Sequence, residues 1–119
     1  MYEEFMMEDA EICVVSFGIA SRVSKNAIMA ARAKGIKVGM IRPITLWPFP
    51  KDALKKAAKN VKAFLSVELN MGQMVDDVKL AIDCAKPVYF YGRTGGVIMS
   101  PEEVLGEIEK IQKGEAKQW

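Results

Sequence analysis

Four short runs of apolar residues, separated by segments with helical periodicity, constrain the fold more than any other feature of this sequence. The runs are ICVVSF (12–17), IKVGMI (36–41), VKAFLSVEL (61–69) and PVYFY (87–91). They are continuous rather than alternating, which is typical of strands covered on both faces. Because a helical pattern follows each run, we predict a βαβαβαβα chain with a mainly parallel sheet between two layers of helices.

The segments between these runs carry the start and stop signals of helices. The first helix ends at Gly35, and the second starts with Pro50, which suits the first helical position. The third opens at Asn70, where Gln73 completes a variant of the capping box. The fourth has the strongest start signal, in which Ser100 is followed by proline and two glutamates, and Lys110, Lys113 and Gly114 mark its end. The apolar faces expected to pack on the sheet are Val23, Ala27, Ala30 and Ala31 in the first helix and Met71, Met74, Val75, Val78 and Ile82 in the third.

The length and composition fit one globular domain over residues 1–119. Hydrophobic residues make up 50% of the chain and charged residues 27%, the ordinary balance of a globular protein. No apolar run reaches the roughly 18 residues that span a bilayer, and the acidic start MYEEFMMED lacks the features of a signal peptide. We therefore expect a cytoplasmic protein with no membrane partner. Its net charge of +2 comes from interspersed acids and bases, so nucleic acid is not an expected partner either.

Missing residue types and motifs narrow the chemistry further. The sequence has no histidine and no Cys-x-x-Cys pair, so we do not expect zinc or iron–sulfur sites. The phosphate-binding motifs GxGxxG and GxxxxGK do not occur. Cys13 and Cys84 lie in a strand-like run and near a helix end, where reduced core thiols are expected. We therefore expect no catalytic, cofactor-binding or metal-binding residue in this chain.

The most unusual residues follow the ends of the predicted strands. In parallel sheets, ligands and partners bind outside the carboxyl ends of the strands. The segment IRPITLWPFP (41–50) follows the second run, and its three prolines predict an ordered loop that does not extend the strand. We expect an interface at this edge of the sheet. Its candidate residues are Arg42, Pro43, Trp47, Phe49, Glu68, Asn70 and Arg93.

Each candidate also has a simpler structural explanation. Arg42 and Arg93 could be solvated or paired with nearby acids. Glu68 precedes a helix start, where the helix dipole alone stabilises a carboxylate. The GRTGG segment could be a turn that needs positive φ, and Trp47 and Phe49 could fill a small core beneath their loop. Both explanations stay open for each residue, and their collection on one edge favours the interface.

Three separated motifs resemble a known family. RPITLWPFP, VELNMGQMVDDVKLA and GRTGG with the later SPEEV are similar to the C-terminal part of the alpha subunit of 2-oxoacid:ferredoxin oxidoreductases of the 2-oxoglutarate and branched-chain 2-oxoacid type. The resemblance extends from about Asp9 to Ile111. It implies a three-layer α/β/α fold like the C-terminal domain of transketolase, with four or five strands. The implied strand order is 36–41, 12–17, 61–69 and 87–91, with an antiparallel edge strand over 2–7 as the optional fifth.

The resemblance also implies a place in an enzyme complex. Members of the family decarboxylate 2-oxoacids on thiamine diphosphate, reduce ferredoxin through iron–sulfur clusters and form acyl-CoA. The thiamine-binding GDG…N pattern and the cluster cysteines are missing from this chain. In the family those elements lie on other domains and subunits, including a beta subunit. The chain is then a non-catalytic accessory domain, either a fragment or a split subunit, that binds none of these cofactors and reaches ferredoxin indirectly.

Two hypotheses about function therefore stay open. In the first, the chain is such an accessory domain, and its rigid proline loop packs on a neighbouring domain at a low entropy cost. In the second, it is a free-standing flavodoxin-like module that binds a nucleotide or other anion at Gly18–Ser21 and the helix starts. The missing glycine-rich phosphate motif argues against the second hypothesis.

Overall fold

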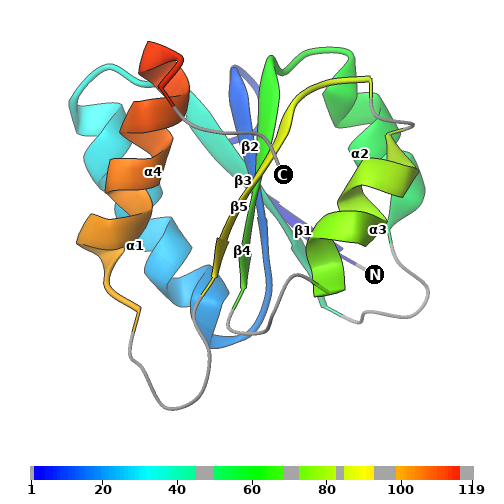
Figure 1. Cartoon of the computed structure of the whole chain (residues 1–119), viewed down its shortest axis with the longest axis horizontal. Helices are drawn as coiled ribbons and strands as arrows, with labels where there is room; N and C mark the ends of the chain where they lie inside the picture. The colour runs from blue at the N-terminus through cyan, green and yellow to red at the C-terminus, as the bar shows by residue number, and fades with distance from the viewer. Residues whose placement is uncertain (1, 45–49, 69–72, 83–84, 93–98, 116–119) are drawn as a thin grey trace.

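The computed structural model describes residues 2–44, 50–68, 73–82, 85–92 and 99–115. In this part of the chain, a five-stranded sheet lies between two layers of helices (Figure 1). The elements are β1 (Tyr2–Phe5), β2 (Ile12–Ser16), α1 (Ile19–Ala33), β3 (Val38–Pro43), α2 (Lys51–Ala58), β4 (Ala63–Glu68), α3 (Gln73–Ala81), β5 (Val88–Gly92) and α4 (Pro101–Lys113).

The topology of the sheet matches the predicted fold class. The strands lie in the order β1-β3-β2-β4-β5; β1 is antiparallel to β3, and the other pairs are parallel. Helices α1 and α4 cover one face, and α2 and α3 cover the other (Figure 1). The three-layer fold, the order of the four parallel strands and the antiparallel edge strand are thus confirmed.

Three of the four apolar runs form strands buried on both faces, whereas in β5 only Val88 is fully buried. Every residue of β2 and β4 is buried. Successive side chains of a strand point to opposite faces, so Phe64 and Leu65 enter two different cores. Phe64 packs in the cluster that holds Leu54, under α2 and α3, whereas Leu65 packs in the cluster that holds Ile28, under α1 and α4. Each layer of helices therefore closes one core.

Most of the helix end signals act as predicted. Gly35 follows α1 with a φ of 86°, and Gly114 ends α4 with a φ of 77°, the left-handed conformation that glycine favours. The Ser100 hydroxyl accepts a hydrogen bond from the Glu103 backbone N–H at 3.3 Å and so caps α4. Pro50 lies one position earlier than expected, because its carbonyl accepts the first helical hydrogen bond, from Leu54, and α2 begins at the next residue.

The second predicted strand is displaced along the chain. It runs from Val38 to Pro43 instead of 36–41, because the Ile36 N–H bonds the Ala31 carbonyl and completes the end of α1. At its other end β3 extends into the proline-rich segment, which we expected to be loop, by pairing Pro43 with Tyr2 of β1. The parallel pairing with β2 ends at Ile41, so the missing N–H of Pro43 lies beyond the part of β3 that pairs with β2.

The buried face of α1 also differs from the prediction. Ala27 and Ala31 are buried as expected, but Ala30 is exposed. Ile28 and Ser24 take its place on the sheet side, since residues one and four positions apart share the helix face that contacts a broad sheet. In the third helix Val75, Val78 and Ile82 are buried as predicted. The predicted start at Asn70, the methionines 71 and 74, and Cys84 lie outside the described side chains.

Candidate functional site

Three of the predicted interface residues lie at the carboxyl ends of parallel strands. Arg42 and Pro43 end β3, and Glu68 ends β4, with β2 between the two strands. These three residues therefore lie at the carboxyl edge of the sheet, where the sequence places them. Trp47, Phe49, Asn70 and Arg93 lie outside the described residues, so their positions stay predictions.

Arg42 is paired across the strands. Its Nε lies 3.3 Å from a carboxylate oxygen of Glu3, which stands opposite it in the β1–β3 register. The side chains of Arg42 and Glu3 remain 32% and 50% exposed, so solvent screens the pair and it contributes little to stability. The arginine therefore keeps much of its charge available at the surface.

Glu68 is buried and links β4 to α3. Only 2% of the residue is exposed. Its Oε2 accepts hydrogen bonds from the Ser66 hydroxyl at 3.0 Å and from the Val75 backbone N–H at 3.1 Å. Val75 lies in the first turn of α3, where backbone N–H groups lack helical acceptors and the helix dipole favours a negative charge. Glu68 thus anchors the start of α3 to the end of the strand.

A hollow of about 400 Å³ opens beside Arg42, at the ends of β2 and β3. It is lined by Phe17, Gly18, Ile19, Arg22, Arg42, Pro43 and Ile44. Sequence reasoning did not select Ile19, Arg22 or Ile44. The sequence did hold a signal for them. Residues 18–22 and 42–44 directly follow the predicted strands 12–17 and 36–41, which the resemblance places side by side.

The start of α1 forms one wall of this hollow. Gly18, with a φ of 63°, makes the turn out of β2, and no side chain caps the helix. The Ser21 hydroxyl donates to the Gly18 carbonyl at 2.6 Å and so belongs to this turn. The hollow lies over β2 and β3, whereas the winding reverses between β2 and β4, where ligands of doubly wound sheets usually bind.

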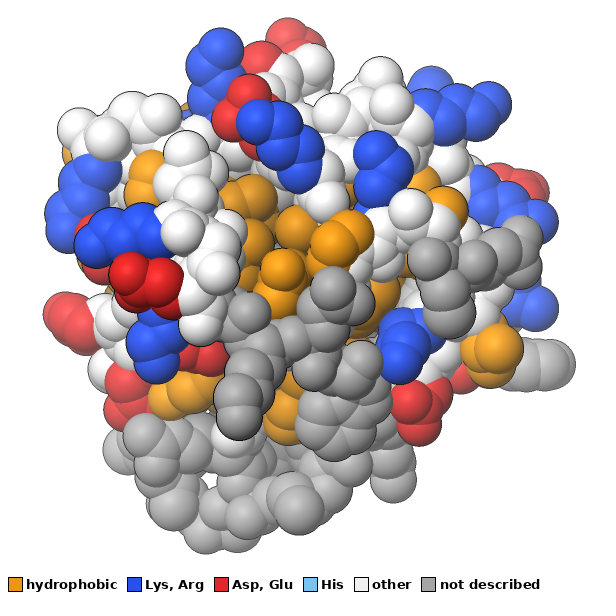
Figure 2. Space-filling view, turned by 45° about the horizontal axis from the view of Figure 1, so that its top comes forward, with side chains coloured by type: hydrophobic (Ala, Val, Ile, Leu, Met, Phe, Trp, Pro, Cys, Tyr) orange, Lys and Arg blue, Asp and Glu red, His pale blue; other side chains and the backbone are white. Residues whose placement is uncertain are grey.

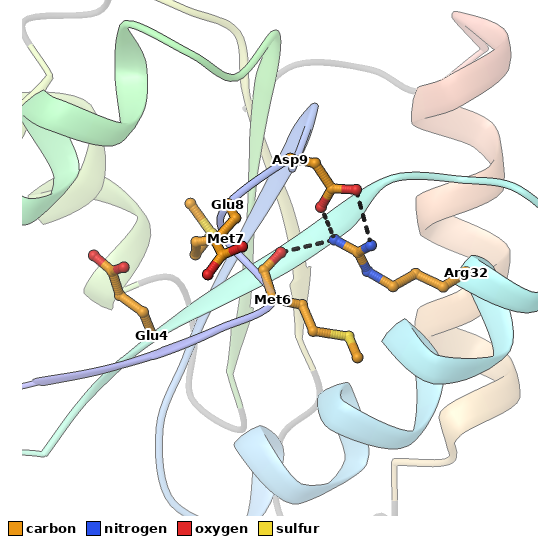
Figure 3. A pocket seen from close by; sticks show the side chains of 6 residues that line it. All are labelled: Glu4, Met6, Met7, Glu8, Asp9 and Arg32. Atoms are coloured by element: carbon orange, nitrogen blue, oxygen red, sulfur yellow. Dashed lines mark hydrogen bonds and ion pairs between the residues drawn. The ribbon is translucent and has the colours of Figure 1, made fainter.

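A second hollow, of about 570 Å³, lies beside the turn between β1 and β2 (Figure 3). It is lined by Glu4, Met6, Met7, Glu8, Asp9 and Arg32. Figure 3 shows the Arg32 guanidinium turned toward Asp9 and the Met6 carbonyl, and the Glu4 carboxylate turned away from them. The Arg32 guanidinium in this hollow therefore hydrogen-bonds the turn between β1 and β2.

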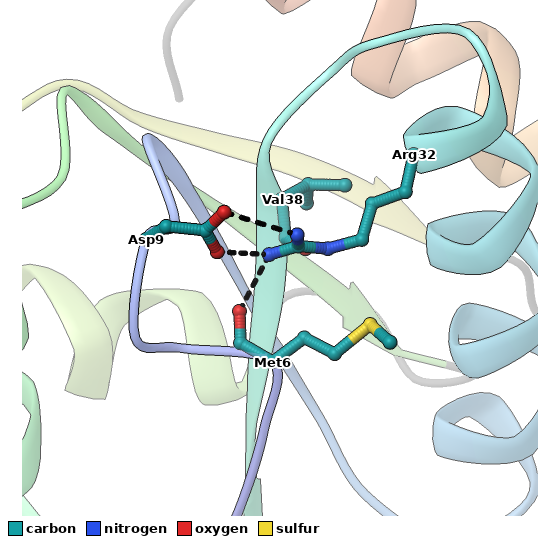
Figure 4. Close-up of polar contacts among 4 residues, drawn as sticks. All are labelled: Met6, Asp9, Arg32 and Val38. Carbon is teal, nitrogen blue, oxygen red and sulfur yellow. Dashed lines mark hydrogen bonds and ion pairs between the residues drawn. The ribbon is translucent and has the colours of Figure 1, made fainter.

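Arg32 joins three segments of the chain (Figure 4). From the last turn of α1 it donates to the Asp9 carboxylate, to the Met6 carbonyl at 2.7 Å and to the Val38 carbonyl at 2.9 Å. The hydrogen bond from Arg32 lowers the pKa of Asp9 below its ordinary value of 3.8. These bonds hold Met6 in a left-handed conformation with a φ of 54° and fix the turn on β3.

Gly39 lets this turn approach the strand. A Cβ at position 39 would lie 2.5 Å from the Met6 carbonyl oxygen and 2.8 Å from the Met7 sulfur. Only glycine allows such a close backbone approach without displacement. The turn between β1 and β2 is thus a packed structural element, and nothing in the local sequence predicts the partners that hold it.

The amino edge of the sheet carries a smaller hollow of about 220 Å³, lined by Glu11, Ile12, Lys62, Ala63, Pro87, Tyr89, Ile111 and Gln112. Figure 2, in which the top of Figure 1 comes forward, shows hydrophobic side chains gathered between the two layers of helices, with Lys and Arg side chains around them. Lys62 lies 3.9 Å from the Glu11 carboxylate. Its polar lining residues include this Lys62–Glu11 pair, which is largely open to solvent.

Two further observations bear on cofactors and membranes. Within the described residues, no three His, Cys, Asp or Glu side chains are grouped so that they could hold a metal ion. Cys13 is fully buried and free, and burial raises the pKa of its thiol far above the ordinary value. None of the helices in the described ranges has the length and hydropathy needed to cross a bilayer.

The family of the chain follows from its sequence matches. Residues 10–104 match the family described as "Pyruvate:ferredoxin oxidoreductase core domain II". The chain belongs to this family. The "Ketoisovalerate oxidoreductase subunit VorB" of Methanothermobacter marburgensis is 47% identical over 110 residues, which are 92% of this chain and 31% of that subunit. The "2-oxoglutarate synthase subunit KorA" of the same organism is 37% identical over 85% of this chain and 27% of its own length.

Solved structures support the same fold for this core domain II member. A 2-oxoglutarate:ferredoxin oxidoreductase from Magnetococcus marinus aligns with a TM-score of 0.75 and 21% identity, covering 92% of this chain and 19% of that one. A split-gene transketolase aligns with a TM-score of 0.76 and 18% identity over 91% of this chain and 40% of that one. The resemblance to 2-oxoacid:ferredoxin oxidoreductases and the transketolase-like fold are thus confirmed. The chain spans less than a third of the length of the VorB and KorA subunits.

Proposed function

We propose that this chain is a non-catalytic assembly domain of a thiamine-diphosphate-dependent 2-oxoacid:ferredoxin oxidoreductase. One observation carries the proposal: 92% of the chain corresponds to only 31% of a VorB subunit. In this proposal the rest of the subunit and its companions supply thiamine diphosphate, the iron–sulfur clusters, the CoA site and the contact with ferredoxin. The domain completes the subunit by packing on those parts.

The polar groups at the carboxyl edge support a structural role. Glu68 is buried and accepts hydrogen bonds from its own strand and from α3. The Ser21 hydroxyl donates to the Gly18 carbonyl of its own turn. Among the described residues, no three His, Cys, Asp or Glu side chains come together that could hold a metal ion. In this proposal the chain carries out no chemical step.

The interface that we propose includes the residues predicted from the sequence. Trp47 and Phe49 belong to the proline-rich segment that follows β3. Asn70 comes two positions after β4, and Arg93 directly follows β5. All four lie outside the described residues, so this part of the interface rests on their place in the sequence. The partners are neighbouring domains of the same subunit and a beta subunit, and the location that we propose is the cytoplasm.

A reconstitution experiment tests this function. The probe is the Methanothermobacter VorB subunit without the region that this chain matches, produced with its companion subunits. The matched VorB region, made as a separate chain, is the positive control. We expect this chain to co-purify with the truncated enzyme and to restore ketoisovalerate-dependent reduction of a redox dye. Turnover by the pure chain alone, or no association where the VorB region associates, would contradict the proposal.

The alternative, an anion-binding module at Gly18–Ser21, has a separate test. A ligand present at a hundred times its dissociation constant stabilises a protein by about 2.7 kcal/mol. A thermal-shift screen of the isolated chain with nucleotides, thiamine diphosphate and CoA would detect such a ligand. We expect no shift, since Ser21 is already bonded within its turn and the hollow lies away from the reversal of the winding.

A further inference from the structure

The hollow at the ends of β2 and β3 combines positive charge with exposed apolar side chains. Arg22 and Arg42 both line it, one from the first turn of α1 and the other from the end of β3. Ile19 and Ile44 line the same hollow and are 67% and 45% exposed. The strand order brings the two segments together, because β2 and β3 are neighbours in the sheet.

The charge of this hollow is not balanced from within. None of the described residues that line it is acidic. Within the described ranges, Arg42 pairs with the Glu3 carboxylate at 3.3 Å, and this pair is largely open to solvent. The first turn of α1 contains no acid, although a helix start favours negative charge. Negative charge on a partner that covers the hollow would therefore complement its two arginines.

We propose that this hollow is a docking surface for an acidic segment of a neighbouring part of the same oxidoreductase, a segment whose carboxylates meet Arg22 and Arg42 and whose apolar side chains cover Ile19 and Ile44. The inference rests on the proposed function and names the chemistry of the partner. Arginine is among the residues that dominate the energetics of protein interfaces, and apolar side chains form the buried core of such interfaces.

A protein segment fits the hollow better than a small anion. A phosphate or carboxylate alone would pair with the arginines but would leave Ile19 and Ile44 in water. The hollow also lies one strand away from the reversal of the winding, between β2 and β4. Charge complementarity and exposed apolar surface thus point to the same kind of occupant.

Arg22→Glu separates docking from folding. The substitution reverses the charge at the hollow and places a carboxylate in the first turn of α1, where the helix dipole favours it. We expect the isolated variant to melt at or above the temperature of the wild type. Its dissociation constant for the truncated VorB enzyme should rise by about tenfold or more.

Lys37→Glu is the matched control. Lys37 is exposed and directly precedes β3, at the opposite edge of the sheet, so the same change in charge should alter the dissociation constant by less than about twofold. The affinity of the wild type should also fall with added NaCl more steeply than that of Arg22→Glu.

The outcomes distinguish the inference from the function on which it rests. If the wild-type chain does not bind the truncated VorB enzyme while the VorB region does, both the docking surface and the assembly role are contradicted. Binding of the wild type together with unchanged binding by Arg22→Glu overturns the docking surface and leaves the assembly role intact. Stabilisation of the wild type but not of Arg22→Glu by inorganic phosphate, with unchanged assembly, would assign the hollow to a small anion and also overturn the inference.

Discussion

Removing the buried carboxylate of Glu68 should weaken the attachment of α3 to the sheet. The carboxylate accepts hydrogen bonds from the Ser66 hydroxyl and from the Val75 N–H, and both donors are buried with it. A hydrogen bond to a charged group is worth about 1.5–3 kcal/mol, and a buried donor left without an acceptor costs about 1–3 kcal/mol. We expect Glu68→Ala to lower the free energy of unfolding by about 3–5 kcal/mol, because two buried donors lose their acceptor.

Two milder substitutions separate charge from hydrogen bonding. Glu68→Gln keeps an oxygen acceptor but removes the charge near the start of α3, and should cost about 1–2 kcal/mol. Ser66→Ala removes one donor and should cost about 1 kcal/mol. If the side chains of Glu68 and Ser66 interact, the stability loss of the double variant Ser66→Ala/Glu68→Gln should differ from the sum of the two single losses by about 0.5–1.5 kcal/mol. Glu8→Gln, which neutralises an exposed acid, should remain within about 0.5 kcal/mol of the wild type.

The assay is equilibrium unfolding of the isolated chain in urea or guanidinium chloride. We expect a single cooperative transition for the wild type, since each apolar run and helix end signal agrees with the observed fold. A loss of stability below about 1 kcal/mol for Glu68→Ala would refute the anchoring role, because a buried acceptor of two hydrogen bonds cannot be removed at so small a cost.

Three further outcomes test the packing and the interface. Arg32 lowers the folded-state pKa of Asp9, so the pair stabilises the fold fully above the unfolded pKa. This effect is lost as the pH falls from the ordinary value of 3.8 through the lower folded pKa. Thermal melts of Asp9→Asn and wild type should therefore differ at neutral pH and converge only below the folded pKa of Asp9. Gly39→Ala should lower the free energy of unfolding by about 2 kcal/mol or more, since its Cβ would meet a carbonyl of the β1–β2 turn. Gly106→Ala is the control: Gly106 lies inside α4 with open space around it, so this change should be neutral or stabilising by up to about 1 kcal/mol. Denaturant melts measure both. Trp47→Ala should leave the isolated chain within about 1 kcal/mol of the wild type but weaken assembly by about 2 kcal/mol; a loss of 3–5 kcal/mol in the isolated chain with unchanged assembly would place Trp47 in the core instead.

The carboxyl edge shows how far the candidate site could be predicted. The strand ends indicated Arg42 and Glu68, and the structure places both there. Glu68 has the helix-start environment that its sequence position suggested, and Arg42 has the acidic neighbour that was its simpler explanation. Arg22 and Ile44 were missed, since each becomes notable only when the other lies across the same hollow.

The sequence by itself determined the elements and the family. Continuous apolar runs predicted strands buried on both faces, and Gly35, Ser100 and Gly114 marked helix ends that the structure confirms. These signals are local, because a cap or a strand interior depends on a few neighbouring residues and on the period of the apolar pattern. The motifs that resemble 2-oxoacid:ferredoxin oxidoreductases are likewise read along the chain.

The tertiary structure decided which distant residues meet. Pro43 belongs to a strand because β1, some forty positions earlier, pairs with it. Arg32 holds Asp9 and the Met6 carbonyl, contacts that depend on how α1 ends beside the β1–β2 turn. Such contacts arise from the strand order, which no local pattern encodes, since a helix of given length can return the chain to either side of its strand.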